Sequence, residues 1–593
     1  MNLTGSKEKS SKELPNEVRM VIAFILMGVI LVVTPFVYRK FGLMPPEQAH
    51  KTQTAKTQSA APQPAADQAA KTPSEKNQPE KAQARPGKTQ TEPAPAAAPA
   101  ANPVGASDEQ EFTVDTSLYQ VVFSNRGAVV KSWTLKKFKD RAGKPLELVN
   151  QPGVQKTGFP FTFDFRGQKP STDLNTALWV AHPGADGLSI SYEFSDGRTT
   201  AKKTLAFQRD GYMVQYADEV ALNGAGLSHV VEWRAGFGDL AVQSAPSHQS
   251  TVRYDDSRGK LVTENAKAAK NGPVSNTAND AFAGIEDQYF LAAFLPPQNT
   301  QLETVTYNDS VPTPFNSADE AYPGVGVGGE ARNQLGLYVG PKELNDLRKV
   351  NPRLQNVIDW GWFGILAKPL FIVLQWMNSS FVHNYGWSII LITILISVAL
   401  FPLKIANLKS MRKMQALQPE ISRINDKYKG IGMSDPRSQQ KQQEIMALYK
   451  ANGVNPMGGC IPMLIQLPFL YAFYRVLDVT IEMRFASWLW VSDLSQPEHF
   501  AIRFLPLIMI GSGFLLQKMT PMTGGDPNQQ KIMQFMPLMW GFFFWPAASG
   551  LVLYWLTSNL VSIAQQWFFN KTAPPLPAAV PARKPNPKGR KTA

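Results

Sequence analysis

The chain has 593 residues, a formal net charge of +13, and a composition that changes sharply along its length. That length suits two or three domains. The single cysteine, Cys460, excludes an intrachain disulfide and a cysteine-cluster metal site. The six histidines form no metal-binding pair, so we predict no metal and no cofactor. Because no nucleic-acid motif accompanies the basic charge, we attribute that charge to membrane topology and to anionic lipid headgroups.

The N-terminal part is predicted to be an uncleaved membrane anchor followed by a linker. Residues 1–19 are polar and basic, and the apolar run at 20–38 is about as long as a bilayer requires. No small-residue cleavage signal ends this run, so we do not expect a removed signal peptide. Residues 39–107 consist largely of Ala, Pro, Gln, Lys and Thr. They cannot bury enough apolar surface to fold, and we predict a disordered linker.

Short runs of alternating apolar and polar residues fill positions 108–345. Tyr119–Asn125 and Tyr212–Val220 are two such runs, and Gly, Asp, Asn and Pro lie between them. Period-two alternation between turns predicts an antiparallel β-sandwich. The glycine-rich segment 324–330 lacks the Lys-Ser/Thr pair of a phosphate-binding loop, so we expect an ordinary loop there.

The C-terminal third is predicted to cross the membrane five more times, which makes six spans in all. These five spans are expected at 385–403, 456–478, 503–517, 532–547 and 549–568. Residues 346–384 are predicted to form connecting helices and an interfacial amphipathic helix, and a plain buried helix is the alternative for Lys368–Phe381. The fold class is therefore an α-helical polytopic membrane protein with an all-β domain.

The segment 404–455 is the most basic part of the chain. Apolar residues recur every three or four positions from Leu408 to Tyr428, which predicts one arm of a helical hairpin with a buried apolar seam. By the positive-inside rule this hairpin is cytoplasmic. Counting alternate sides then places the 518–531 loop, the basic tail 569–593 and the N-terminus in the cytoplasm. The β domain and the segment 479–502 lie on the other side.

Arg475 interrupts the apolar span 456–478, and Asp478 follows it by three residues. A lone cation near the middle of a span costs about 2.5–3.5 kcal/mol on insertion scales, so it must meet water or an opposite charge. Two alternatives stay open. Arg475 either faces a hydrated groove or forms an internal ion pair with Asp478.

The order of these parts resembles the YidC family of membrane protein insertases in its Gram-negative form. The stretches that carry the resemblance most specifically are Asn455–Tyr474, Gln529–Phe544 and Ser549–Gln566. The resemblance implies a non-enzymatic insertase and chaperone of the inner membrane, with a periplasmic β-sandwich and a five-helix core. That core encloses a hydrophilic groove open to cytoplasm and lipid. Implied partners are nascent membrane proteins, the Sec translocon, the ribosome and signal-recognition machinery.

The resemblance also shows one departure from the family. Relatives usually carry an arginine in the second span where this chain has Ser397, so Lys404 and Arg475 are candidates to supply the missing charge. We expect a substrate groove that includes Arg475, Ser397, Lys404, Gln466 and Tyr471. We expect the substrate's own span to contact Leu467, Phe469, Phe535 and Met536. The structural alternatives are a hydroxyl of Ser397 bonded to the preceding helical turn and a cross-helix bond from Gln466.

Four basic residues of the hairpin, Arg412, Lys413, Lys427 and Lys429, are predicted to contact acidic partners such as ribosomal RNA. A solvated, lipid-facing run of charges is the alternative. A secondary transporter is the alternative function, although the chain lacks the internal repeats and paired broken helices expected of one. Arg475→Ala is expected to impair insertion of substrates with acidic translocated tails.

Overall fold

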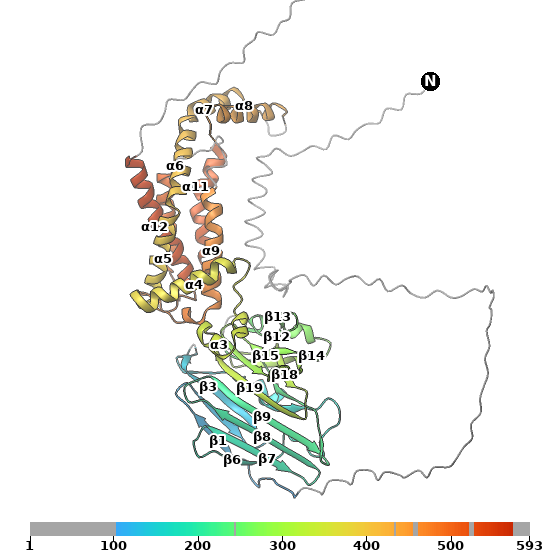
Figure 1. The fold of residues 1–593 in the computed structure, drawn as a ribbon. Coiled ribbons are helices and arrows are strands. Elements are labelled where there is room, and N and C mark those ends of the chain that lie inside the picture. Colours follow the sequence, from blue (N-terminus) through green and yellow to red (C-terminus); the bar gives the residue numbers. More distant parts are fainter. Residues whose placement is uncertain are drawn as a thin grey trace, which may run out of the picture.

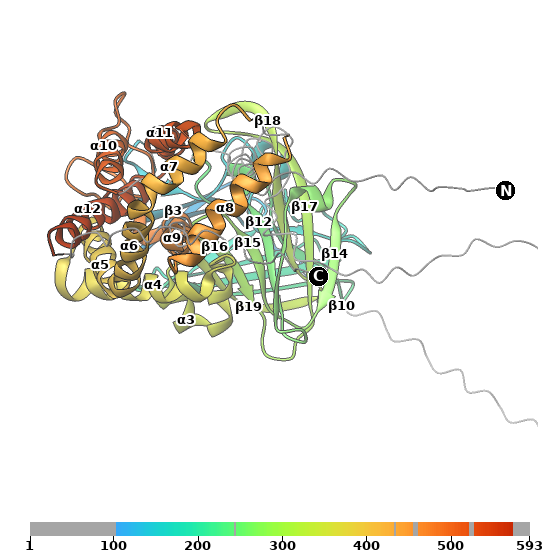
Figure 2. The same cartoon turned by 90° about the horizontal axis from the view of Figure 1, so that it is seen from above.

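The computed structural model describes residues 102–140, 142–241, 245–431, 435–454, 461–520 and 527–572. The predicted anchor at 20–38, nearly all of the linker, Cys460 and the tail beyond residue 572 lie outside these residues. The described chain forms two parts, a β domain and a bundle of helices joined end to end (Figure 1). Seen from above, the helices cover part of the β domain, which extends beyond them on one side (Figure 2).

The β domain contains three sheets, and the strand pairs within them are antiparallel. The four-stranded sheet has the order β1 (Glu111–Asp115), β2 (Tyr119–Ser124), β3 (Val129–Lys139) and β4 (Pro145–Glu147). The five-stranded sheet has the order β14 (Val274–Ala278), β17 (Leu302–Thr313), β18 (Asn316–Gly328), β11 (Val230–Trp233) and β5 (Thr162–Asp164).

The largest sheet runs across the domain. One half is β13 (Lys260–Glu264), β12 (Ser250–Asp255), β15 (Asp280–Glu286), β16 (Phe290–Leu295) and β19 (Arg332–Pro341). The other half is β9 (Met213–Leu222), β8 (Thr199–Phe207), β7 (Ser189–Ser195) and β6 (Val180–Pro183), with the short β10 (Ala225–Gly226) paired to β9.

The period-two pattern explains how this domain forms its core. Along β9 the even-numbered residues Val214, Tyr216 and Val220 are buried, while the odd-numbered ones face outward or are half-buried. Trp133, Trp179 and Trp233 are fully buried. Removing such large rings from water is a main favourable contribution to the free energy of folding. The predicted antiparallel β-sandwich is confirmed.

The expectation of a loop at 324–330 is wrong, because residues 324–328 belong to strand β18. Val325 and Val327 are fully buried. The intervening glycines leave room for neighbouring chains, since a Cβ on Gly326 would lie 2.9 Å from Val230 Cγ2. A strand that packs this closely against a neighbour requires glycine.

A short connection leads from the β domain to the helices. Helix α3 (Leu344–Val350) and the 3₁₀ helix η4 (Pro352–Val357) precede α4 (Gly364–Met377) and the π turn η5 (Asn378–Val382). By length and composition, Gly364–Val382 is apolar enough to cross a membrane. Figure 1 shows α4 lying across the end of the bundle, as an interfacial helix would. Trp376 and Ile365 are exposed, which suits contact with headgroups and acyl chains.

By length and composition, the described residues hold one helix able to cross a membrane, or two if the bent pair α5 and α6 forms one span, so the count of six spans stays a prediction. The bundle is built from six described helices, most of them rich in apolar residues. They are α5 (Tyr385–Ala399), α6 (Phe401–Ala416), α9 (Ile461–Val479), α10 (Phe504–Met519), α11 (Pro527–Phe544) and α12 (Ser549–Thr572). Their outer faces are apolar, with Leu395, Phe542 and Phe568 all more than half exposed. An apolar surface of this kind is typical of helices that face lipid.

Helix α6 leaves the bundle and continues into the basic hairpin. It bends by 59° from α5, next to Pro402, whose ring and missing N–H favour a new helix start. The hairpin consists of α7 (Gln418–Lys427) and α8 (Arg437–Ala451). The predicted apolar seam is confirmed as one cluster of buried side chains: Met414, Leu417, Ile421, Leu448, Tyr449 and Val454.

Candidate functional site

A small cavity lined by both polar and apolar side chains lies inside the otherwise apolar bundle. Its volume is about 180 Å³. It is lined by Gln466, Leu467, Leu516, Trp540, Trp555, Ser558, Asn559 and Ser562. These residues come from α9, α10, α11 and α12, so four helices meet around one cavity. We call this the bundle pocket.

Helix α12 supplies most of the polar groups of the bundle pocket. Ser558, Asn559 and Ser562 line the pocket, and Gln565, which does not line it, follows Ser562 by three residues on the same face of the helix. Polar groups in a lipid-embedded bundle must find partners inside it, because lipid offers none. Ser558 Oγ accepts a hydrogen bond from Gln466 Nε2 on α9 at 2.9 Å. The predicted cross-helix bond of Gln466 is thereby confirmed.

Two further bonds hold α12 to its neighbours. Asn559 Nδ2 donates to Ser512 Oγ on α10 at 3.1 Å. Gln565 Nε2 donates to the backbone carbonyl of Ser397 on α5 at 3.0 Å. Ser397 therefore meets the polar face of α12 through its main chain.

Lys404 brings a positive charge to this polar face. Its Nζ donates to Ser562 Oγ at 2.6 Å, which joins α6 to α12. The side chain is only half-buried. An ammonium has three N–H donors, and among the described residues Lys404 makes no ion pair. A cation beside a polar pocket, with donors remaining, can attract an acidic group.

Arg475 lies elsewhere. Its Nη1 contacts the Asp478 carboxylate at 2.9 Å, and its Nη2 contacts the Asp359 carboxylate at 2.9 Å. The alternative prediction of an ion pair with Asp478 is confirmed. Arg475 does not line the bundle pocket, and its guanidinium is bound by two carboxylates at the end of α9 nearest the β domain. Its groove role stays a prediction.

The other predicted groove residues divide between these two places. Leu467 lines the bundle pocket, whereas Tyr471 packs its ring against Phe363 at the start of α4, with centroids 5.5 Å apart. Phe469 and Met536 are half-buried and do not line the pocket, and Phe535 is 62% exposed on α11. Phe535 is thus open to contact from outside the bundle, and its contact with a substrate span stays a prediction.

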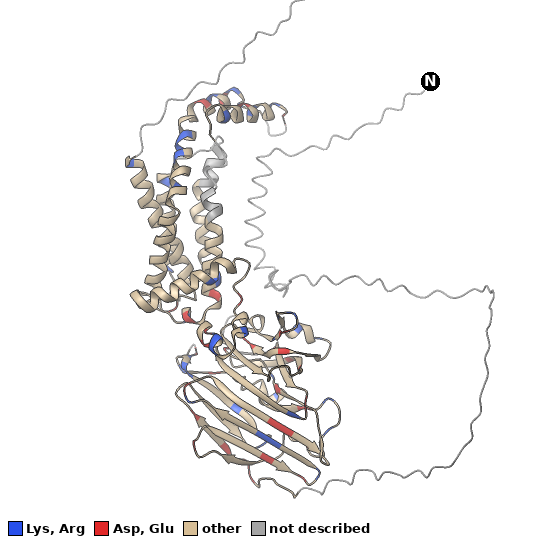
Figure 3. Cartoon of the chain, viewed as in Figure 1, with Lys and Arg blue, Asp and Glu red and all other residues tan. Residues whose placement is uncertain are grey.

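The four predicted partner-binding residues of the hairpin differ in their surroundings. Arg412 lies over the ring of Phe569, 5.5 Å from its centroid. Lys427 pairs with Glu444 at 2.6 Å. Lys413 and Lys429 are exposed. Figure 3 shows basic residues distributed along α6 and the hairpin.

The sequence did not lead us to predict three of the residues that line the pocket, Ser558, Asn559 and Ser562. Their signal was present, because three polar residues share a short stretch of an apolar helix, and polar residues inside spans usually face the bundle interior. Ser512 is a weaker case. A lone serine in an apolar helix usually bonds its own backbone, and Ser512 Oγ does also donate to the Met509 carbonyl at 2.7 Å.

No group of His, Cys, Asp or Glu side chains among the described residues could hold a metal ion. The fold and the site together define a membrane protein that joins a β-sandwich domain to a helical C-terminal region with a polar pocket.

Comparison with known proteins gives the family. The model of the YidC periplasmic domain matches residues 111–373, and the 60Kd inner membrane protein model matches residues 376–575. The chain belongs to the YidC family of membrane protein insertases.

Curated relatives agree over most of the chain. The membrane protein insertase YidC of Syntrophus aciditrophicus is 35% identical over 80% of this chain and 87% of its own length. That of Cupriavidus necator is 35% identical over 85% of this chain and 89% of its own length. A crystal structure of an active YidC insertase, with its first transmembrane domain resolved, aligns with 79% of this chain and 94% of that chain. Its identity is 19% and its TM-score 0.34. These relatives give the transporter alternative no support.

Proposed function

We propose that this protein inserts membrane proteins, and that the bundle pocket with Lys404 receives the polar part of the substrate. The observation that carries this proposal is a half-buried cation bonded to Ser562, a polar residue in the lining of a cavity within the apolar bundle. The curated relatives are named as membrane protein insertases, which gives the substrate class. No bond is made or broken, so the protein acts as an insertase and chaperone without catalytic residues.

The physical step is a lowered cost of moving a polar tail into the membrane. A tail that crosses bare hydrocarbon loses its hydrogen bonds to water, at several kcal/mol for each unsatisfied group. Ser558, Asn559, Ser562 and Gln466 offer replacement partners. Lys404 adds attraction for an acidic residue of the tail. The substrate's apolar segment then leaves past exposed side chains such as Phe535, driven by hydrophobic transfer.

The proposed topology follows from charge. Six spans place both chain ends and the basic hairpin in the cytoplasm, and the β domain in the periplasm. The exposed Lys413 and Lys429 suit acidic partners such as the ribosome, signal-recognition machinery or anionic lipids. The Sec translocon is a further proposed partner.

The experiment uses purified full-length protein in lipid vesicles. The substrate is a single-span test protein with an acidic translocated tail, and insertion is read by protection of that tail from protease. We expect Lys404→Ala to lower the insertion rate about five- to tenfold, because one charge attraction is lost. Lys404→Arg keeps the charge and should insert nearly as well as the wild type.

The matched control is Lys409→Ala, which removes an exposed lysine from the same helix α6. It should leave insertion unchanged. Equal rates for Lys404→Ala and Lys409→Ala would refute the role of Lys404. No insertion above protein-free vesicles by the wild type would refute the proposed function itself.

A further inference from the structure

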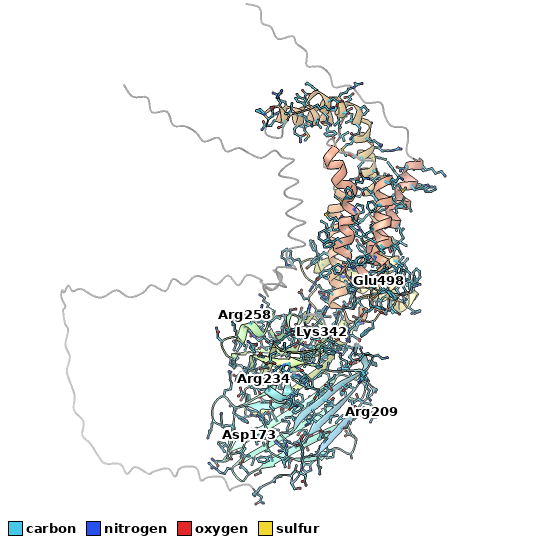
Figure 4. The ribbon with its side chains drawn as sticks, turned by 180° about the vertical axis from the view of Figure 1, so that it is seen from behind. Asp173, Arg209, Arg234, Arg258, Lys342 and Glu498 are labelled. Carbon is cyan, nitrogen blue, oxygen red and sulfur yellow. The ribbon has the colours of Figure 1, made fainter. Side chains whose placement is uncertain are left out.

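Charged residues gather where the helical bundle meets the β domain (Figure 3). We call this region the junction. Figure 4 places Lys342 on the face of the β domain nearest the helices and Glu498 at the base of the bundle. Lys342 is bound within the β domain, because its Nζ contacts the buried Glu286 carboxylate at 3.1 Å. The junction therefore has a fixed β-domain side against which the helices can be held.

Arg475 joins two segments that are far apart in sequence. It holds Asp478, three residues later on α9, and Asp359, which lies 116 residues earlier in the connection to α4. Arg475 is only 9% exposed, so its two ion pairs are partly shielded from water. Planar guanidinium groups bind carboxylates in a fixed geometry, which makes this contact directional.

Asp478 continues the connection into the β domain. Gln288 Nε2 donates to the backbone carbonyl of Asp478 at 2.8 Å and to its carboxylate at 3.3 Å. Gln288 lies in the turn between β15 and β16. That turn is held by the preceding residue, Asp287, whose carboxylate accepts from the backbone N–H groups of Tyr289 at 2.8 Å and Asp239 at 2.6 Å.

A second contact with the β domain is made by Arg484, in the segment that follows α9. The Arg484 guanidinium pairs with the Asp239 carboxylate and donates to the Lys139 carbonyl at 3.0 Å. Both side chains of the Arg484–Asp239 pair are buried. The end of α9 and the segment after it are therefore attached to the β domain at two points.

The same helix also lines the bundle pocket. Gln466 and Leu467 stand eight or nine residues before Arg475 on α9, which corresponds to about 12–14 Å along the helix axis. Pro468 lies between Leu467 and Arg475, but the helix stays continuous from Ile461 to Val479, so a tilt or shift at its end can reach the pocket-lining side chains.

We propose that Arg475 is a positioning residue for insertion. By binding Asp359 and Asp478, and through Asp478 the β domain, it fixes the part of α9 that lines the bundle pocket. The β domain thus sets the shape of the pocket from outside the bundle. The consequence for insertion rests on the proposed function of the pocket, whereas the positioning itself does not.

The test needs a readout of pocket geometry that is separate from insertion. Cys460→Ser removes the native cysteine, and Leu467→Cys then places a single thiol on the pocket lining. In full-length protein in vesicles, we measure the rate at which a water-soluble maleimide labels this thiol. Insertion of the acidic-tailed test protein is measured on the same samples without the thiol substitutions.

Four variants separate positioning from general damage. Arg475→Ala should raise the labelling rate about two- to tenfold, because the two ion pairs that help to hold the end of α9 are lost. Arg475→Lys keeps one charge and should restore much of the wild-type rate. Asp359→Asn alters an exposed partner, whose side chain is 57% exposed, and should give a smaller rise in a protein that still folds. Lys349→Ala breaks an exposed ion pair with Asp346 on α3 and is the control.

A raised rate in Arg475→Ala and Asp359→Asn, with Lys349→Ala unchanged, supports the positioning role. An unchanged rate in both junction variants overturns it, including the case in which insertion falls, since Arg475 would then act without moving α9. If Arg475→Ala does not fold, Asp359→Asn alone decides. A raised labelling rate with normal insertion supports the positioning of α9 and instead refutes the role of the pocket in insertion.

Discussion

The β domain and the helical bundle each hold a lysine away from water, and they satisfy it differently. In the β domain, Lys203 Nζ donates to the carbonyls of Phe161 at 2.7 Å and Ala128 at 2.9 Å, with Gly127 O at 3.5 Å. It also lies 4.2 Å from the centroid of the Phe163 ring. Three donors therefore meet three acceptors within a closed core.

Lys404 in the bundle is the opposite case. Among the described residues its bond is to one hydroxyl, that of Ser562, which lines the bundle pocket. A cation with every donor satisfied is structural, because it has nothing left to offer a ligand. A cation with donors remaining beside a cavity can act on one. We therefore expect substitution of Lys203 to lower the stability of the β domain and substitution of Lys404 to lower insertion activity.

The largest expected effect is on the stability of the β domain. Lys203→Ala leaves three carbonyls without their donor and opens space in a closed core, at a cost of about 3–5 kcal/mol. The free energy of unfolding can be followed by tryptophan fluorescence during denaturation in detergent. Lys202→Ala, at the exposed neighbouring position on β8, should cost less than about 0.5 kcal/mol. Equal losses in the two variants would contradict the comparison.

The next largest effect is the pH dependence of the stability of the β domain. Burial lowers the pKa of Lys203 to about 7, although the negative charge of Asp218 opposes the change. In the unfolded chain the pKa returns to its ordinary value near 10.4. Between these values the unfolded state binds more protons, so stability rises with pH. The loss of stability caused by burying the charged Lys203 is complete below pH 7 and disappears above about pH 10.

We expect the free energy of unfolding of the β domain to rise by about 2–4 kcal/mol from pH 7 to pH 10 through this group. The measurement is denaturation of the wild type and of Lys203→Met at both pH values. The rise should be smaller by that amount in Lys203→Met. The same rise in both proteins would show that Lys203 does not titrate as described.

Lys404→Met should change stability by less than about 1 kcal/mol, because a half-buried lysine with one hydroxyl partner is replaced by an apolar residue of similar length. Insertion of an acidic-tailed substrate should nevertheless fall as for Lys404→Ala. Thermal unfolding and protease protection on the same preparation separate the two effects. A large loss of stability would make Lys404 structural, like Lys203.

The smallest effect is expected at Gln466. Replacement by leucine removes its bond to Ser558, and cross-helix bonds of this kind average about 0.6 kcal/mol in membrane bundles. Thermal unfolding in detergent measures this difference. A loss above about 2 kcal/mol would mean that Gln466 holds the bundle together and does not merely line its pocket.

The sequence predicted much of the fold because its signals are local. Alternation along β9 defines which side chains enter the core, and the apolar repeat from Leu408 onward defines the hairpin seam. The part of strand β18 at residues 324–328 was not predicted, because glycine has no side chain that would show which face is packed. Its requirement for glycine comes from Val230 and Tyr307 on neighbouring strands, which no local pattern identifies.

The site shows the same limit. The pairing of Arg475 with Asp478 could be predicted from their spacing on one helix, but Asp359 could not, since it reaches Arg475 only through the tertiary fold. Lys404 was a candidate because Ser397 stands where relatives carry an arginine. Its partner Ser562 is 158 residues away, and only the packing of α6 on α12 brings the two together.

The attraction of Lys404 for an acidic substrate tail is tested most directly by reversing the charge at Lys404 and in the substrate tail in one experiment. Two matched single-span proteins, with either two aspartates or two lysines in the translocated tail, are inserted by the wild type and by Lys404→Glu. We expect the wild type to favour the acidic tail and Lys404→Glu to reverse the preference. The same ratio of insertion rates in both proteins would contradict this expectation.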